Sequence, residues 1–455
     1  MRRRAALLLA ALLAACTPSG PAPQAARAAG ALLELPPALR FAGPPSPPSP
    51  TPANPQLARD ILALTFALET GRRLDTFTRF EGPVTVGVEV VGTDLPPTLD
   101  PDLDDLLGRL RREAGIPISR AGRGELASIT VSVLPRARLR RELRGAACFV
   151  VPNVSGWRDY LRRRGGAETD WAALRTRTRA SVFLPADMGA QEVRDCLHEE
   201  VAQALGPLND LYRLPSSVFD DANMHVVLTA WDMLVLRATY DPALRSGMTE
   251  AEVAAALPGV LARINPGGRR PDGGAVAESP PEWTAAVAQA LDPEAPDRLR
   301  LARAREAVAR ARAADWRDTR TALSLLALGR ALLAYDTEAA RAAFLEAGSL
   351  YRLRAGEGIE TARVTLQLAA IALASGQAEA AVAQLDRALP AARGAQDAAL
   401  LSTMLLLRSE ALSYLGRGAE GARARREGLA WGRYAWGDGE LALRAAELAG
   451  LAPAA

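Results

Sequence analysis

The amino-acid sequence predicts an α+β domain followed by an all-α domain of helical repeats. Two observations predict the first domain: valines alternate along residues 84–90, and an apolar stripe with helical spacing follows at 191–205. One observation predicts the second: three similar turns place Glu338, Glu379 and Glu420 at a constant spacing of 41 residues. Strands therefore precede a long helix, and the last third of the chain is helical throughout.

Length and charge narrow the class of protein. The chain has 455 residues, which is too long for one ordinary domain, and a net charge of only +3. All basic residues are arginines, and they are mixed with acidic residues along the chain. No basic block with interleaved aromatic residues is present, so the sequence does not predict nucleic-acid binding. The excess of arginine and alanine is typical of a GC-rich genome and is not interpreted as functional.

The N-terminal residues predict export and lipid anchoring. A charged stretch, 2–4, precedes an apolar stretch, 5–15, that is too short to span a bilayer. Leu-Ala-Ala before Cys16 resembles a bacterial lipobox, which predicts a signal peptide at 1–16 and a lipidated Cys16. Acyl chains on that cysteine would hold the protein in the cell envelope, facing the periplasm. Thr17 favours the outer over the inner membrane. The alternative is an ordinary secretory signal with an incidental cysteine.

Export and lipidation also bear on the residues after Cys16 and on the two other cysteines. Residues 17–54 are rich in Ala and Pro and cannot bury a core, so they predict a tether between the membrane and the first domain. With Cys16 lipidated, Cys148 and Cys196 remain in an oxidising compartment. They are expected to pair, and two buried thiols are the alternative.

The domain from 55 to 265 carries the predicted α+β elements. The sequence pattern predicts helices near 58–71, 102–114, 157–164, 191–205 and 223–240, with a shorter helix after the last, and strands near 84–90, 129–133, Ala147 and Ser181. Residues 266–296, which begin with many Pro and Gly, predict a linker, and 297–455 form the helical repeats.

The stretch from His198 to Asp210 carries the main candidate site. It opens like the zinc-peptidase motif H-E-x-x-H, but Ala202 stands at the second ligand position. Shifted by one residue, the pattern places Glu199, Gln203 and Asn209 at the three ligand positions. Glu200 then stands where the general base belongs, and Gly206 stands at the turn.

A helical wheel supports the shifted frame. Glu200 lies about 50° from the centre of the apolar stripe, and Gln203 and Glu199 continue on the same side. His198 falls on the opposite flank. It is therefore expected to be a surface residue or one that contacts any ligand only indirectly.

This region resembles a known family. The matching pattern is C-x-x-E-E-x-x-Q-A-L-G-x-x-N-D, then S-V-F-D-D, then D-P-x-L-x-x-G-M, and its residues are Cys196, Glu199, Glu200, Gln203, Ala204, Leu205, Gly206, Asn209, Asp210, Ser217, Val218, Phe219, Asp220, Asp221, Asp241, Pro242, Leu244, Gly247 and Met248. It is similar to the bacterial domain-of-unknown-function 2927 family. The resemblance covers about 54–265 and implies a zincin-like domain in exported proteins, with no established activity.

Residue chemistry argues against zinc at this motif. Zinc sites use imidazole, thiolate and carboxylate ligands, and the only histidines are His198 and His225. Glutamate and amide oxygens would instead suit Ca²⁺ or Mg²⁺, with Asp210, Asp220 and Asp221 adding further oxygens. The preferred interpretation has no metal and no cofactor. In it, Glu200 and Gln203 hydrogen-bond loop backbone and hold the helix against the sheet.

The last third resembles tetratricopeptide-type helical pairs, with a period longer than the usual 34. An irregular helical bundle is the alternative. Such repeats leave an extended surface that binds protein or peptide. The sequence therefore predicts a lipid-anchored envelope scaffold without catalysis, whose partner is an unidentified protein or peptide. The rival hypothesis is a metal-dependent hydrolase with Glu200 as general base, and a third is a sensor of cell-wall fragments.

Overall fold

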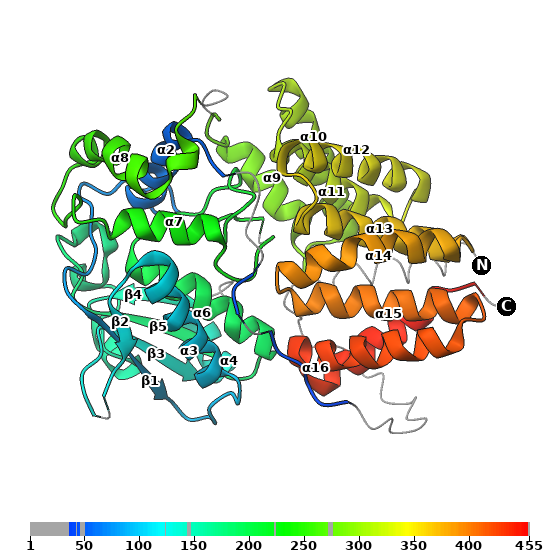
Figure 1. The fold of residues 1–455 in the computed structure, drawn as a ribbon, viewed down its shortest axis with the longest axis horizontal. Coiled ribbons are helices and arrows are strands. Elements are labelled where there is room, and N and C mark those ends of the chain that lie inside the picture. The colour runs from blue at the N-terminus through cyan, green and yellow to red at the C-terminus, as the bar shows by residue number, and fades with distance from the viewer. Residues whose placement is uncertain are drawn as a thin grey trace. The chain divides into compact units, whose positions relative to one another are not determined.

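The computed structural model describes residues 36–41, 43–45, 51–122, 124–142, 147–222, 224–271 and 276–453. The predicted signal peptide, Cys16 and the first part of the tether lie outside these described residues. The chain divides into two compact units: a sheet unit within residues 42–277, and a helical unit formed by residues 36–41 and the described residues from 278 onward (Figure 1). In the described part of the chain, no helix is both long enough and apolar enough to cross a membrane.

The sheet unit is a mixed α/β structure. Its strands are β1 (Val84–Val90), β2 (Ile118–Arg120), β3 (Ile129–Leu134), β4 (Phe149–Pro152) and β5 (Ala180–Pro185). Its helices are α2 (Asn54–Thr65), α3 (Leu99–Arg109), α4 (Arg136–Glu142), α5 (Trp157–Arg163), α6 (Ala190–Leu205), α7 (Ala230–Thr239) and α8 (Glu250–Ile264). A π-helical turn, Leu110–Ala114, extends α3.

The five strands form one sheet in the order β2-β1-β3-β5-β4. The β1–β2, β1–β3 and β3–β5 pairs are parallel, and only β4 runs antiparallel, against β5. Alternation along the strands divides the side chains between two faces. Val131 and Val182, which are paired across β3 and β5, join the main core, whereas Phe183 joins a smaller core.

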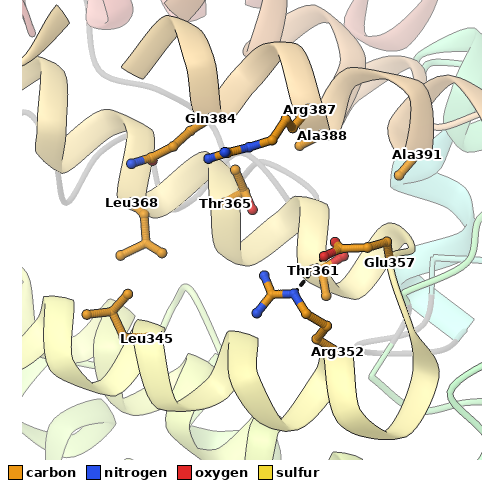
Figure 2. Close-up of a pocket in the computed structure, with 10 residues that line it drawn as sticks. All are labelled: Leu345, Arg352, Glu357, Thr361, Thr365, Leu368, Gln384, Arg387, Ala388 and Ala391. Carbon is orange, nitrogen blue, oxygen red and sulfur yellow. Dashed lines mark hydrogen bonds and ion pairs between the residues drawn. The ribbon is translucent and has the colours of Figure 1, made fainter. Parts of the chain in front are cut away.

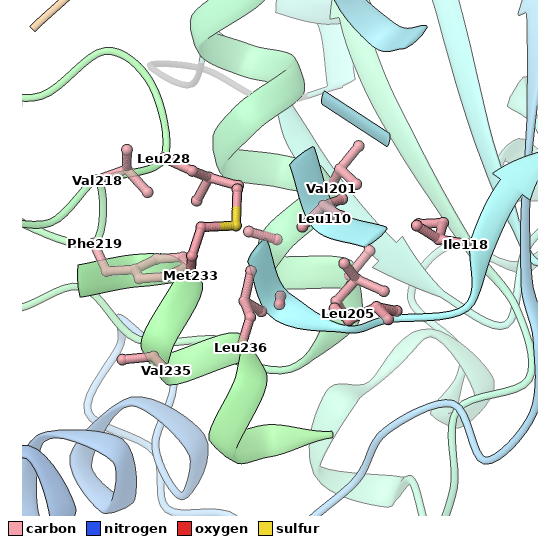
Figure 3. Close-up of a cluster of buried hydrophobic side chains, with 14 of the residues drawn as sticks. Leu110, Ile118, Val201, Leu205, Val218, Phe219, Leu228, Met233, Val235 and Leu236 are labelled. Carbon is pink, nitrogen blue, oxygen red and sulfur yellow. The ribbon is translucent and has the colours of Figure 1, made fainter. Parts of the chain in front are cut away.

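Each face of the sheet has its own helices. The main core receives apolar residues from α2, α3, α6, α7 and α8, and Figure 3 shows the part where α6 meets α7. There Val201 and Leu205 of α6 lie near Met233 and Leu236 of α7. The smaller core lies under α4 and α5. It holds Phe183 against Trp157, with ring centroids 5.5 Å apart.

Several predicted boundaries in the sheet unit are wrong. Helix α2 ends at Thr65, not near 71, because the chain turns back and Ala67 bridges Arg73. Helix α7 begins at Ala230, not 223, because the Thr229 side chain caps it by accepting hydrogen bonds from backbone N–H groups. Helix α8, expected to be short, has 15 residues, against 10 in α7. The prediction missed β2 and α4.

The helical unit is a series of packed helices. They are α9 (Pro281–Leu291), α10 (Asp297–Ala313), α11 (Thr319–Leu332), α12 (Thr337–Ala355), α13 (Ile359–Ala374), α14 (Ala378–Gly394), α15 (Ala398–Tyr414) and α16 (Gly418–Ala449), which breaks at Gly437. Each helix packs against the next in the chain. The recurring Glu338, Glu379 and Glu420 all lie in first turns, those of α12, α14 and α16. The repeat-like pattern of the sequence is therefore present in the structure.

Two segments expected to be linker or tether belong to the helical unit. Helix α9 lies inside the predicted linker 266–296, and its Trp283 is fully buried and donates to Ser324 Oγ at 3.0 Å. Residues 36–41, inside the predicted tether, pack on α16. There the Phe41 ring stacks on Trp431 at 4.2 Å between centroids. Both segments contain aromatic residues that bury large apolar surfaces.

Candidate functional site

The helix that carries the motif, α6, is held at both ends. At its start the Glu192 carboxylate accepts a hydrogen bond from the Gly189 N–H at 3.2 Å. At its end the buried guanidinium of Arg177 donates to the carbonyl oxygens of Ala204 at 2.8 Å and Gly206 at 2.6 Å. A helix end leaves such carbonyl groups without intrahelical partners, and Arg177 satisfies them. The motif residues are therefore presented on a fixed helix.

Cys148 and Cys196 form a disulfide with an S–S distance of 2.08 Å. The predicted pairing is confirmed. It links the residue just before β4 to the face of α6 that packs on the sheet.

His198 is a buried structural residue. Its side chain is 1 % exposed, and Nδ1 accepts a hydrogen bond from the Leu228 N–H at 3.2 Å. Burial, with the positive charges of Arg194 and Arg109, lowers the pKa of the imidazole well below its usual value. The expectation of a surface residue is wrong. The residue fell on the opposite flank of the helical wheel, but that flank is covered by the segment leading into α7.

Acidic side chains from separate segments lie near enough to one another beside α6 for their charges to interact. Glu199 and Glu200 come from α6, Asp210 from the loop that follows it, Asp221 from farther along that loop, and Glu69 from the turn after α2. We call these five residues the carboxylate cluster. Among the described residues, none of the five forms an ion pair, although the chain is rich in arginine. The cluster is therefore a concentration of acidic groups without compensating charge.

Hydrogen bonds to the cluster are also few among the described residues. Glu200 is 5 % exposed and makes no hydrogen bond with another described residue, and the buried Oδ1 of Asp210 has no hydrogen-bond partner there. The expectation that the Glu200 and Gln203 side chains hydrogen-bond loop backbone is therefore wrong, since Gln203 donates to the Glu69 side chain. Burial, then the charges of Glu199 and Glu69, raise the pKa of Glu200 well above its usual value. Burial and the four other carboxylates raise that of Asp210 in the same way.

Two further members titrate near neutral pH. Burial, then the charges of Glu69 and Asp221, raise the pKa of Glu199 to about 7. Burial and Glu69 raise the pKa of Asp221 to about 6. The cluster can therefore hold protons at pH values where isolated carboxylates are ionised.

The two motif amides have different roles. Gln203 belongs beside the cluster, because its Nε2 donates to Glu69 Oε1 at 3.3 Å. Asn209 instead donates from Nδ2 to the carbonyl oxygen of Ala63 at 3.0 Å, which fastens the loop to α2. Gly206 stands where a Cβ atom would lie 2.8 Å from Thr239 Cγ2, so a side chain would clash with α7. Glu69 and Arg177 were missed, because nothing in their local sequence distinguishes them from surface residues.

The remaining family positions stabilise the fold. Asp220 is not one of the five cluster residues. Its Oδ1 accepts a hydrogen bond from the Ala222 N–H at 3.0 Å, which forms a local turn. Ser217 Oγ donates at 2.6 Å to Asp232, which is completely buried at the start of α7. These contacts fasten the loop that carries Asp210 and Asp221.

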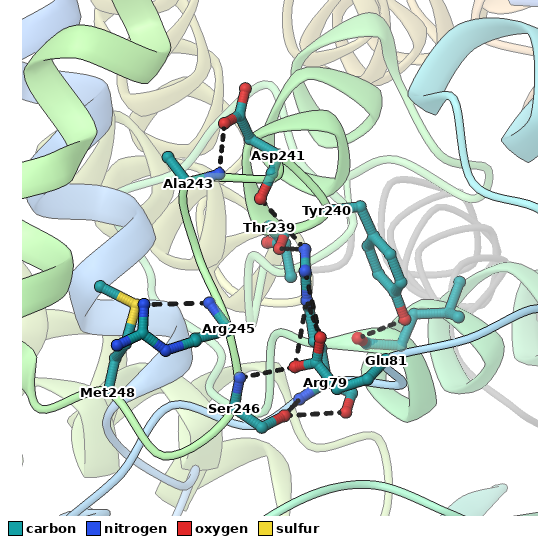
Figure 4. A network of polar contacts seen from close by, with 10 residues as sticks. Arg79, Glu81, Thr239, Tyr240, Asp241, Ala243, Arg245, Ser246 and Met248 are labelled. Carbon is teal, nitrogen blue, oxygen red and sulfur yellow. Dashed lines mark hydrogen bonds and ion pairs between the residues drawn. The ribbon is translucent and has the colours of Figure 1, made fainter.

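The D-P-x-L-x-x-G-M stretch, residues 241–248, forms the connection between α7 and α8. Arg79 donates from Nη1 to the carbonyl oxygens of Thr239 at 3.0 Å and Asp241 at 3.2 Å (Figure 4). Gly247 has a φ of 90°, which glycine adopts without strain. Its N–H donates to the carbonyl oxygen of Phe77 at 2.9 Å. These contacts hold the turn, and the Asp241 carboxylate accepts hydrogen bonds from Arg263 at 2.8 and 2.9 Å.

The described residues contain no group of three or more His, Cys, Asp or Glu side chains that could hold a metal ion. The members of the carboxylate cluster influence one another's charge without converging on one point. As they stand, they can exchange protons or attract a cationic group.

A second candidate site lies in the helical unit. Two adjoining cavities of about 570 and 370 Å³ run along α12, α13 and α14 and share Leu345, Leu368 and Gln384. We call them together the α12–α14 groove. Figure 2 shows the larger cavity, with α13 residues between the side chains of α12 and α14. Its other lining residues are Arg352, Glu357, Thr361, Thr365, Arg387, Ala388 and Ala391.

Residues 54–259 match a family described as "Protein of unknown function (DUF2927)". This match agrees with the resemblance that the motif residues indicated. No match was found among curated proteins or among solved structures. The family description names no activity, so the two candidate sites are the basis for the proposed function.

Proposed function

We propose that this protein is an exported, lipid-anchored envelope scaffold that binds a protein partner through its helical unit. The observation that carries the proposal is the α12–α14 groove, in which Leu345 remains 47 % exposed at the centre. A large apolar side chain lining a concave surface is typical of a binding site. The N-terminal lipobox-like residues supply the expected anchor at Cys16.

The repeat pattern supports this role. Glu338, Glu379 and Glu420 recur at the starts of alternate helices, which favours a tetratricopeptide-like arrangement. Arrays of this type build their binding surfaces from side chains of successive helices. The groove uses such side chains, since α12, α13 and α14 all line it.

In the sheet unit we propose a zincin-like domain that has lost metal chemistry. Carboxylate and amide groups stand at the positions where a zinc peptidase needs imidazole. The Nδ1 atom of His198 already accepts a hydrogen bond from the Leu228 N–H. The carboxylate cluster then serves as a proton-binding element that holds the loop after α6. No cofactor is required for that role.

The buried environment of Glu200 supports a second candidate function. A buried carboxyl group with a raised pKa is a common property of general acids and bases, so hydrolysis with Glu200 in that role is the second candidate. It would require Ca²⁺, Mg²⁺ or another ion held by non-histidine ligands. Glu200→Gln would then abolish turnover of a substrate, whereas the scaffold proposal predicts that partner binding is unchanged.

Two experiments test the scaffold proposal. Cys16→Ser should abolish incorporation of labelled palmitate, because the thiol that carries the lipid is lost, whereas globomycin should block removal of the signal peptide and leave a larger, palmitate-labelled precursor in the sedimented membranes. Photo-crosslinking from a groove position in the full-length protein should trap a partner that Leu345→Asp fails to trap. Equal trapping by both proteins would contradict partner binding through the groove, and palmitate labelling of Cys16→Ser at the wild-type level would contradict the anchor.

A further inference from the structure

The centre of the α12–α14 groove is apolar. Leu345 of α12 and Leu368 of α13 line both cavities. Ala388 and Ala391 of α14 line the larger cavity, where their small side chains leave space. An apolar side chain of moderate size would bury its surface here and cover the exposed Leu345.

One wall carries a polar group without a partner. The Oε1 atom of Gln384 is buried and has no hydrogen-bond partner among the described residues. Rotation of the terminal amide would turn this oxygen toward the groove, because that torsion is soft. A carboxamide offers one acceptor and two donors, which match the N–H and C=O groups of a peptide backbone. A helix uses these groups internally, so only an extended segment offers them freely.

The same wall carries a cation. Arg352 pairs with Glu357, with Nε and Oε1 2.6 Å apart. The exposed Arg387 forms no ion pair with another described residue, although its charge also acts on Glu357. In Figure 2 the Arg387 and Gln384 side chains extend the same way from α14, above Thr365. The larger cavity therefore has one more positive than negative charge. A carboxylate would complement it, and Arg can bind a carboxylate through two hydrogen bonds.

Resting on the partner-binding function, we propose that the α12–α14 groove binds an extended peptide segment with an apolar side chain next to a carboxylate. The apolar side chain lies between Leu345 and Leu368. The backbone amide contacts Gln384, and the carboxylate, from Asp, Glu or a chain terminus, contacts Arg387.

Selection from a phage-displayed library of short random peptides tests this inference on residues 17–455, the chain without its signal peptide and lipidated Cys16. Selected peptides should carry Asp, Glu or a free C-terminus beside an apolar residue. Arg387→Glu should weaken their binding at least about tenfold, and added salt should weaken binding to the wild type. Gln384→Met, which keeps the side-chain length, should weaken the binding of all selected peptides.

Arg426→Glu is the matched control, because Arg426 is an exposed arginine of α16 that lines neither cavity. It makes the same charge change and should leave binding unchanged. Equal melting temperatures of Arg387→Glu and wild type would show that the first variant is folded.

The other outcomes separate this inference from the proposed function. Peptides that require Leu345 but carry no acidic group would overturn the carboxylate assignment and leave partner binding intact. Peptides that bind Leu345→Asp as well as wild type would overturn both. Dimers in sedimentation equilibrium that dissociate in Leu345→Asp would show that a second copy occupies the groove, which would overturn the peptide assignment.

Discussion

Arg177 donates a hydrogen bond to the carbonyl oxygen of Gly206 at 2.6 Å, so a buried cation caps the end of the motif helix. The same guanidinium contacts Ala204 and lies 4.8 Å from the centroid of the Trp171 ring. Burial lowers the pKa of Arg177 to about 10, which leaves it charged at neutral pH. This residue holds the loop on which the carboxylate cluster depends.

Arg177→Met should destabilise the sheet unit by about 3 kcal/mol or more, because several buried carbonyl groups lose their donor. Urea unfolding of the mature chain measures the change. Arg72→Met is the control: Arg72 is largely exposed and pairs with Asp170 at the surface, so its loss should change stability by less than about 1 kcal/mol. Equal effects of the two substitutions would contradict the capping role.

The carboxylate cluster should make stability fall as pH rises. Glu199 and Asp221 have raised pKa values of about 7 and about 6, so the folded chain binds protons that the unfolded chain has released. This contribution is fully present below about pH 4 and is lost as pH rises through about 7. Urea midpoints measured from pH 4.5 to 8 should therefore decline. Glu199→Gln should flatten the decline, and an unchanged slope would count against the cluster.

Glu200→Gln should stabilise the protein at pH 8 by about 1 to 3 kcal/mol, because it replaces a buried, uncompensated acid with a neutral group of similar shape. At pH 4.5 the gain should nearly disappear, since Glu200 is protonated there. Thermal unfolding at the two pH values measures the difference. Destabilisation at pH 8 would indicate instead that the Glu200 carboxylate has a bound cation or donor.

Gly156→Ala should lower the free energy of unfolding by more than about 2 kcal/mol, because it disturbs the smaller core. Gly156 has a φ of 88°, and an added Cβ would collide with the Glu89 carboxylate. Glu89 accepts the Trp157 N–H at 2.8 Å at the start of α5, so the collision would also disturb that helix. Gly82→Ala is the control, because nothing lies within 4 Å of a Cβ at that position. Near-UV circular dichroism of the aromatic core would report the change.

Local pattern was sufficient for much of the fold. The alternating valines predicted β1 and β3, and the apolar stripe predicted α6 within one residue at its start. These predictions succeeded because side-chain periodicity depends only on neighbours in the chain. The disulfide followed from counting cysteines. Boundaries such as the start of α7 failed, because a cap at Thr229 and not periodicity sets them.

The sequence by itself determined the two-part organisation, the family and the motif residues Glu199, Glu200 and Gln203. Only the tertiary structure decided what surrounds them. Glu69 lies 134 residues before Gln203 and still contacts it, and His198 is buried because the segment before α7 covers it. The groove likewise depends on three helices packing together. Contacts between segments far apart in the chain determine which side chains are buried and which charges surround them. No local sequence pattern predicts these contacts.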